Sequence, residues 1–229
     1  MSTQTFFFYD LETTGFSSSE DRIMQFAGQR TDMELKPIGE PVNQLIKLTP
    51  DVVPSPDAIM LTGITPQKTL EDGITEAEFL KTFHGEISIP GTIFVGFNSI
   101  RFDDEFIRNL NYRNLRDPYE WAYADGRSRW DILDLARITR ALRPDGIKWP
   151  MGKDKDGKPK VTNRLGELAA TNDLLHESAH DALSDVLATI EVAKLIRTKQ
   201  PKLFEFMLGV RSKKDVLGVV NGGKPFVYT

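Results

Sequence analysis

The segment Thr5–Thr13 combines an aromatic run with two acids near its end, and no other feature of the chain constrains its fold as much. The run from Phe6 to Tyr9 indicates a buried β-strand. Side chains alternate between the faces of a strand, so the carboxylates of Asp10 and Glu12 point the same way, about 7 Å apart. Such acids repel each other unless a cation lies between them. Their spacing predicts a site for Mg²⁺ or Mn²⁺, and a pair of ions about 3.5–4 Å apart would share one carboxylate. The alternative is a solvated strand end with two surface acids.

The rest of the chain predicts an α/β protein with a mixed sheet. Strands are expected at residues 5–12, 21–29, 43–48, 92–98 and 128–131. Helices are expected at residues 75–83, 101–110, 132–142, 164–170 and 179–199. The first three strands follow one another as antiparallel neighbours, and the later strands alternate with helices. Proline-rich residues 50–56 and Gly-, Pro- and Lys-rich residues 144–160 are expected to form loops.

Composition excludes several classes of protein. The chain has 229 residues, of which 40% are hydrophobic and 27% are charged, which is typical of a soluble globular domain. It has no cysteine, which excludes disulfides and thiolate metal sites. Its three histidines cannot form a histidine-rich zinc centre without carboxylate ligands. A net charge of −4 argues against strong, sequence-independent duplex binding. The N-terminus carries no basic leader and no apolar run is long enough to span a membrane, so we expect a cytoplasmic protein.

Further acidic residues are expected to lie close to Asp10 and Glu12. Asp103 follows the strand at 92–98, and sites in α/β sheets collect at the carboxyl ends of strands. The alternative for Asp103 is an acid stabilised by a helix N-terminus, and its neighbour Asp104 is expected to be solvated. Asp185 borders a core-facing helical stripe formed by Ala182, Val186, Thr189, Ile190 and Ala193. A lone acid there is costly unless it is paired or binds a metal. His180 precedes it near the helix start and can overhang the same site.

These five residues, in this order, resemble the DEDD exonuclease superfamily in its histidine subclass. The set is Asp10-x-Glu12, Asn98 with Phe102-Asp103, and His180 five residues before the last acid, Asp185. A closer resemblance to the bacterial exonuclease I family covers nearly all of residues 5–210. Its most specific segments are Arg101-Phe102-Asp103-Asp104-Glu105 and Ser128-Arg129-Trp130-Asp131.

The resemblance implies a ribonuclease H-like fold: a mixed five-stranded sheet flanked by helices. It also implies that Asp10, Glu12, Asp103 and Asp185 hold two Mg²⁺ ions, for which Mn²⁺ can substitute, and that His180 is the general base. The reaction would remove 5′-mononucleotides from the 3′ end of single-stranded DNA, in DNA repair or recombination. The rival interpretations are a short-RNA exonuclease, a proofreading-type exonuclease and a non-catalytic nucleic-acid-binding domain.

Substrate contacts are also carried over from the resemblance. The terminal nucleotide would touch Glu12, Thr13 and Gly15. Aromatic stacking and positive charge hold single strands, and the residues expected to supply them are Arg108, Tyr119, Tyr123, Arg137 and Arg164. The alternative for Tyr119, Trp121 and Tyr123 is a place in the core. Trp130 and Trp149 are expected to pack, and Asp131 and Asp134 to be structural.

Residues 1–210 are expected to form the exonuclease domain. Residues 211–229 resemble the opening strands of an SH3-like domain cut short, which indicates a fragment or a naturally shorter homologue. In the exonuclease I family an SH3-like and a helical domain close over the DNA. The expected partners are single-stranded DNA and single-stranded-DNA-binding protein, with no membrane, and a monomer is expected.

Overall fold

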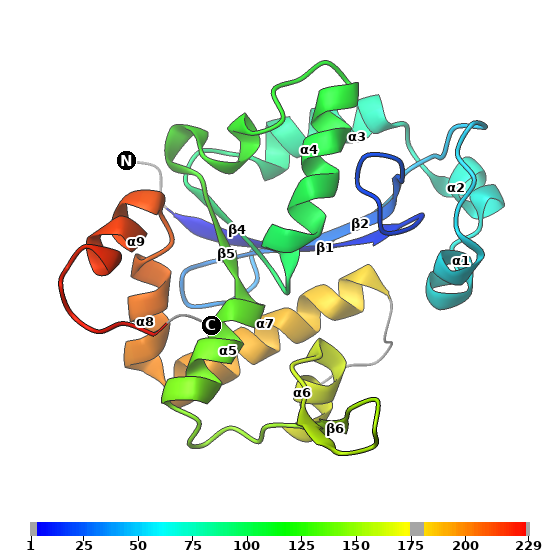
Figure 1. Cartoon of the computed structure of the whole chain (residues 1–229). Coiled ribbons are helices and arrows are strands. Elements are labelled where there is room, and N and C mark those ends of the chain that lie inside the picture. The colour runs from blue at the N-terminus through cyan, green and yellow to red at the C-terminus, as the bar shows by residue number, and fades with distance from the viewer. Residues whose placement is uncertain (1–3, 175–180, 228–229) are drawn as a thin grey trace.

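A five-stranded mixed sheet forms the centre of the molecule (Figure 1). The computed structural model describes residues 4–174 and 181–227. The spatial order of the strands is β3-β2-β1-β4-β5. Their bounds are Thr5–Thr13 (β1), Ile23–Thr31 (β2), Val42–Leu45 (β3), Thr92–Gly96 (β4) and Ser128–Asp131 (β5). β1 pairs antiparallel with β2 and parallel with β4, while β2 with β3 is antiparallel and β4 with β5 is parallel. The predicted mixed sheet is confirmed.

Helices account for most of the remaining regular structure. Their bounds are Pro56–Thr62 (α1), Pro66–Asp72 (α2), Glu76–Thr82 (α3), Asp103–Arg113 (α4), Ile132–Leu142 (α5), Leu165–Thr171 (α6), Ala182–Lys199 (α7), Pro201–Gly209 (α8) and Lys213–Val220 (α9). A π-helical turn at Phe83–Ile87 (η1) and 3₁₀ turns at Ser99–Arg101 (η2), Glu120–Ala122 (η3) and Ala124–Gly126 (η4) connect some of them. No helix among the described residues is long and apolar enough to cross a membrane.

Three expectations about local structure were wrong. Helices α1 and α2 were not expected. Each starts with a proline in its first turn. α1 buries no residue and α2 buries only Thr69, so neither has a buried apolar face. The predicted loop at 144–160 contains a small hairpin, Met151–Lys153 (β6) with Pro159–Val161 (β7). The segment expected to open with strands forms helix α9, because the Ser212 hydroxyl accepts the Asp215 N–H and caps it. The assignment of residues 211–229 to a second domain stays a prediction.

The alternation of β1 divides the core into two layers. Phe6 and Phe8 pack with apolar side chains of α5, α7 and α8 on one face. Phe7 and Tyr9 pack with residues of α3, η1 and α4 on the other. Figure 1 shows α3 and α4 above the sheet and α5 and α7 below it. Asp10 and Glu12 follow the period of Phe6 and Phe8, so they face α7.

The carboxyl ends of the parallel strands β1 and β4 leave room for a functional site. β1 and β4 pair only from Thr5 to Phe8 on the β1 side, and beyond that point their hydrogen bonding ends. The chain leaves β4 through Asn98, whose φ of 69° is tolerated better by asparagine than by most residues, and enters η2 and α4. The N-terminus of α4 therefore lies near the second half of β1, which carries Asp10 and Glu12.

Candidate metal centre and active site

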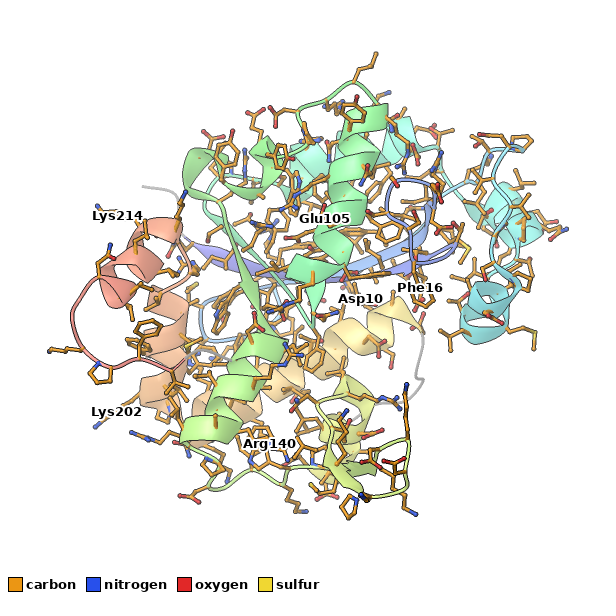
Figure 2. The ribbon with its side chains drawn as sticks, in the orientation of Figure 1. Asp10, Phe16, Glu105, Arg140, Lys202 and Lys214 are labelled. Atoms are coloured by element: carbon orange, nitrogen blue, oxygen red, sulfur yellow. The ribbon has the colours of Figure 1, made fainter. Side chains whose placement is uncertain are left out.

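Three carboxylates meet between β1 and α7. Asp10, Glu12 and Asp185 each offer an oxygen, and these oxygens all lie within 4.8 Å of one another. β1 presents the first two, and the buried stripe of α7 brings in Asp185: Ala182, Val186 and Ile190 are each at most 2% exposed. Figure 2 shows Asp10 in the region between the start of α4 and α7. The predicted proximity of the strand acids and Asp185 is therefore confirmed.

Asp103 approaches the same centre from α4. It is the first residue of that helix and only 4% exposed. Its charge raises the pKa of Asp10, so the two acids interact, although Asp103 lies outside the group of three. Burial raises the pKa of Asp103 well above its usual range, while the backbone N–H groups of Asp103 and Leu11 act in the opposite direction. The helix therefore brings a fourth carboxylate to the site, and this one is buried.

The electrostatics of this cluster favour a cation. Burial, followed by the charges of Asp103 and Asp185, raises the pKa of Asp10 well above its usual range. Burial and the charges of Asp185 and Asp181 raise the pKa of Glu12 to about 8. A divalent cation would remove the repulsion between the carboxylates, which adds to the effect of burial on these pKa values. All the donors are carboxylate oxygens, which are the ligands that hard divalent cations prefer, so the residues fit such a metal.

Residue His180, the predicted general base, lies outside the described residues. Its neighbour Asp181 caps α7: its carboxylate accepts the Ser184 N–H at 3.2 Å and the Gln25 side-chain amide at 3.3 Å. The helix thus begins at Ala182 rather than at the expected residue 179. Sequence reasoning missed Asp181 as an acid of the site. An acid directly before an apolar helical stripe is a typical N-cap signal and could have revealed it.

Asp104 contradicts the expectation of a solvated neighbour. It is 1% exposed, its Oδ1 accepts the Tyr9 hydroxyl, and its Oδ2 forms an ion pair with Arg129. The first turn of α4 lies against the sheet, so a side chain that points away from Asp103 still meets protein rather than water. Burial raises the pKa of Asp104, and the ion pair with Arg129 opposes that effect.

Hydrogen bonds between its own residues stabilise the loop between β1 and β2. The Thr13 hydroxyl donates to the Gly15 carbonyl at 2.7 Å. The Asp21 carboxylate accepts the Thr14 hydroxyl and the Ser17 N–H, each at 2.8 Å. A Cβ on Gly15 would lie 2.5 Å from that carboxylate, so the glycine permits the close approach. The contact of Thr13 and Gly15 with a nucleotide stays a prediction.

The predicted DNA contacts are mostly accessible. Tyr119 and Tyr123 are 56% and 65% exposed, whereas Trp121 between them is 1% exposed and belongs to the core. The Arg108 guanidinium lies 5.3 Å from the centre of the Tyr119 ring. On other elements, Arg137 lies 3.5 Å from Asp134, and Arg164 is 84% exposed beside Glu167.

Phe16, which sequence reasoning missed, is the exposed aromatic residue nearest in sequence to the acids of β1. Its side chain is 88% exposed, and its ring centre lies 6.3 Å from that of Phe102. The signal for it was available: a phenylalanine directly after Gly15, in a loop rather than in an apolar pattern. Figure 2 shows Phe16 on the same side of the molecule as Asp10.

Comparison with known proteins finds relatives that match nearly the whole length of this chain. Curated relatives include Exodeoxyribonuclease I of Haemophilus influenzae, 48% identical over 219 residues, covering 96% of this chain and 46% of the relative. Exodeoxyribonuclease I of Escherichia coli is 44% identical over 226 residues, covering 98% of this chain and 47% of the relative. The chain therefore spans about half the length of these relatives.

Solved structures agree in fold. An Exonuclease I from Methylocaldum szegediense superposes with a TM-score of 0.89 at 51% identity, covering 96% of this chain and 46% of that one. E. coli Exonuclease I in complex with a dA16 oligonucleotide gives a TM-score of 0.88 at 45% identity, covering 94% and 45%. An ExoI/SSB-Ct complex gives 0.88 at 43% identity, covering 95% and 46%.

The family model described as Exonuclease (RNase_T) matches residues 7–193, a span that includes all four clustered carboxylates. The chain belongs to this exonuclease family.

Proposed function

We propose that this chain is the exonuclease part of a Mg²⁺-dependent 3′→5′ exodeoxyribonuclease that degrades single-stranded DNA to 5′-mononucleotides, in DNA repair or recombination. The observation that carries the proposal is the convergence of Asp10, Glu12 and Asp185, with Asp103 beside them. The names of the relatives and the oligonucleotide complex of one of them support single-stranded DNA as the substrate.

The four carboxylates would hold two Mg²⁺ ions, which Mn²⁺ could replace. When bound, such ions make hydroxide available near neutral pH and stabilise the leaving 3′ oxygen. The protein contributes a site at which all four ligands would be carboxylates, and one of them, Asp103, is buried. Because the acids come from β1, α4 and α7, they would approach the reacting phosphate from three elements rather than from one flexible loop.

His180 would act as the general base. Its imidazole takes the proton of the attacking water, whose oxygen forms the new bond to phosphorus while the bond to the 3′ oxygen breaks. The released mononucleotide keeps its 5′-phosphate. Histidine suits this step because its ordinary pKa is close to the working pH, so it can accept a proton and release it again.

The substrate would be held by stacking and by positive charge at separate places. Tyr119 and Tyr123 are exposed enough to stack on bases, and Arg108 lies over the Tyr119 ring, where it can reach a phosphate. Arg137 and Arg164 would contact phosphates farther along the strand, while Thr13 and Gly15 would meet the terminal nucleotide. For the whole protein we propose single-stranded-DNA-binding protein as a partner, since an ExoI/SSB-Ct complex exists for a relative.

The deciding experiment is a gel assay with 5′-labelled single-stranded DNA, duplex DNA and RNA of one sequence. We expect shortening of single-stranded DNA from its 3′ end in Mg²⁺ and none in EDTA. An Asp10→Asn variant is the matched control for a contaminating nuclease. Equal cleavage of RNA would favour the short-RNA exonuclease, and intact DNA in Mg²⁺ and Mn²⁺ would refute the proposal.

A further inference from the structure

Strand β5 holds the beginning of α4 through two side chains. Arg129 and Asp131 stand at positions i and i+2 of Ser128–Asp131, so they share one face of the strand. Trp130 between them faces the other layer, where it packs against Phe6 and Phe204. The face that carries Arg129 and Asp131 therefore looks towards the turn that leads from β4 into α4.

The first contact grips α4 just after Asp103. Arg129 forms an ion pair with one oxygen of Asp104, and the Tyr9 hydroxyl donates to the other oxygen. Asp104 is 1% exposed, so neither oxygen can replace these donors with bulk water. A bidentate grip of this kind fixes both the position and the rotation of the first turn of the helix.

The second contact grips the chain just before Asp103. The Asp131 carboxylate accepts the Asn98 N–H at 2.9 Å and the Ile100 N–H at 3.2 Å. The same carboxylate caps α5 through the Leu133 N–H at 2.9 Å. Asn98 has the left-handed φ of 69°, so the tight turn after β4 is tied directly to β5.

We propose that Arg129, Asp131 and Tyr9 are positioning residues that fix Asp103 at the acidic centre and thereby set the affinity for the metal. Asp103 lies between the two contacts along the chain. Like charges on Asp10 and Asp103 would repel each other, and this repulsion would push the start of α4 away from β1. The contacts from β5 resist that movement. The proposal rests on the proposed function. It also gives a role to residues 101–105 and 128–131, because Asp103 is the only residue of these two segments that belongs to the acid cluster.

The test measures metal binding directly, by isothermal titration calorimetry with Mn²⁺ on the full chain without DNA. We expect Arg129→Met to weaken Mn²⁺ binding by ~10–100-fold, the usual effect of losing an outer residue that keeps a metal ligand in position. Arg129→Lys keeps one charged donor and should recover part of the affinity. The turnover number on single-stranded DNA should fall with the affinity, while KM for DNA stays within about threefold.

Arg127→Met is the matched control. Arg127 lies two residues earlier, and its donors reach the Ser88 carbonyl at 2.8 Å and the Glu120 carbonyl at 3.3 Å, so its loss should lower stability without changing Mn²⁺ affinity. If Arg129→Met fails to fold, Tyr9→Phe, which removes a single hydroxyl, should still weaken Mn²⁺ binding by at least ~3-fold.

Unchanged Mn²⁺ affinity in Tyr9→Phe and in folded Arg129 variants, with a wild type that binds, would overturn the positioning role alone. A wild type that binds no Mn²⁺ would overturn the proposed function itself.

Discussion

Replacing Glu12 by glutamine should stabilise the metal-free protein while removing its function. Burial and the charges of Asp185 and Asp181 raise the pKa of Glu12 from 4.5 to about 8. The folded protein therefore binds a proton that the unfolded chain has released, and the resulting stability is lost as pH rises from about 5 towards 8. Glutamine stays neutral throughout, so it avoids this loss.

The size of the effect follows from the same pKa. One pKa unit corresponds to about 1.36 kcal/mol, so ionisable Glu12 costs the folded protein ~1 kcal/mol at pH 5 and ~4 kcal/mol at pH 8 relative to a neutral side chain. The carboxylate is partly exposed and can relax towards water, which reduces the value at pH 8 to ~2 kcal/mol. The advantage of Glu12→Gln should therefore grow with pH.

Urea unfolding in EDTA at pH 5, 6.5 and 8 measures the free energy directly. Glu40→Gln, at an exposed position in the turn before β3, is the control and should give the same small change at each pH. With Mg²⁺ at a hundred times its dissociation constant, the wild type should gain ~2.7 kcal/mol and the Gln variant less, because it has lost a ligand. A Glu12→Gln variant that is less stable than the wild type in EDTA at pH 8, or whose advantage does not grow with pH, would refute this electrostatic account.

Two further predictions concern the substrate and the base. Phe16→Ala should leave the melting temperature nearly unchanged, because the ring is 88% exposed, but should weaken binding of single-stranded DNA by ~1–3 kcal/mol if the ring stacks on a base. Fluorescence anisotropy with Ca²⁺ in place of Mg²⁺ checks this. The control is Leu115→Ala, at a residue that is 96% exposed and lies just after the C-terminal end of α4; equal losses in both variants would contradict a specific stack. His180→Ala should lower turnover by at least ~10²-fold while Mn²⁺ affinity is kept, and a wild-type rate in single-turnover kinetics would remove His180 from the mechanism.

The sequence by itself determined those features that depend on local periodicity. A period of two along β1 places Asp10 and Glu12 on one face, and a period of 3.6 along α7 places Asp185 beside the buried stripe. The order of strands and helices along the chain was also sufficient to predict a mixed five-stranded sheet. The helix expected at residues 75–83 is present as α3, and a local capping box of Thr75 with Glu78 starts it. These features arise from residues that are neighbours in the chain.

Tertiary structure alone decided which surfaces cover those local faces. The burial of Asp104 depends on Tyr9 and Arg129, which lie 95 and 25 residues away. Tyr119 and Tyr123 are exposed while Trp121 is buried, because the ring of Trp121 packs 4.9 Å from that of Phe94 on the neighbouring layer. A local pattern shows which way a side chain points, but only the packing of distant elements decides whether it meets water, an opposite charge or another acid. The gathering of the acids from β1, α4 and α7 is a property of that packing.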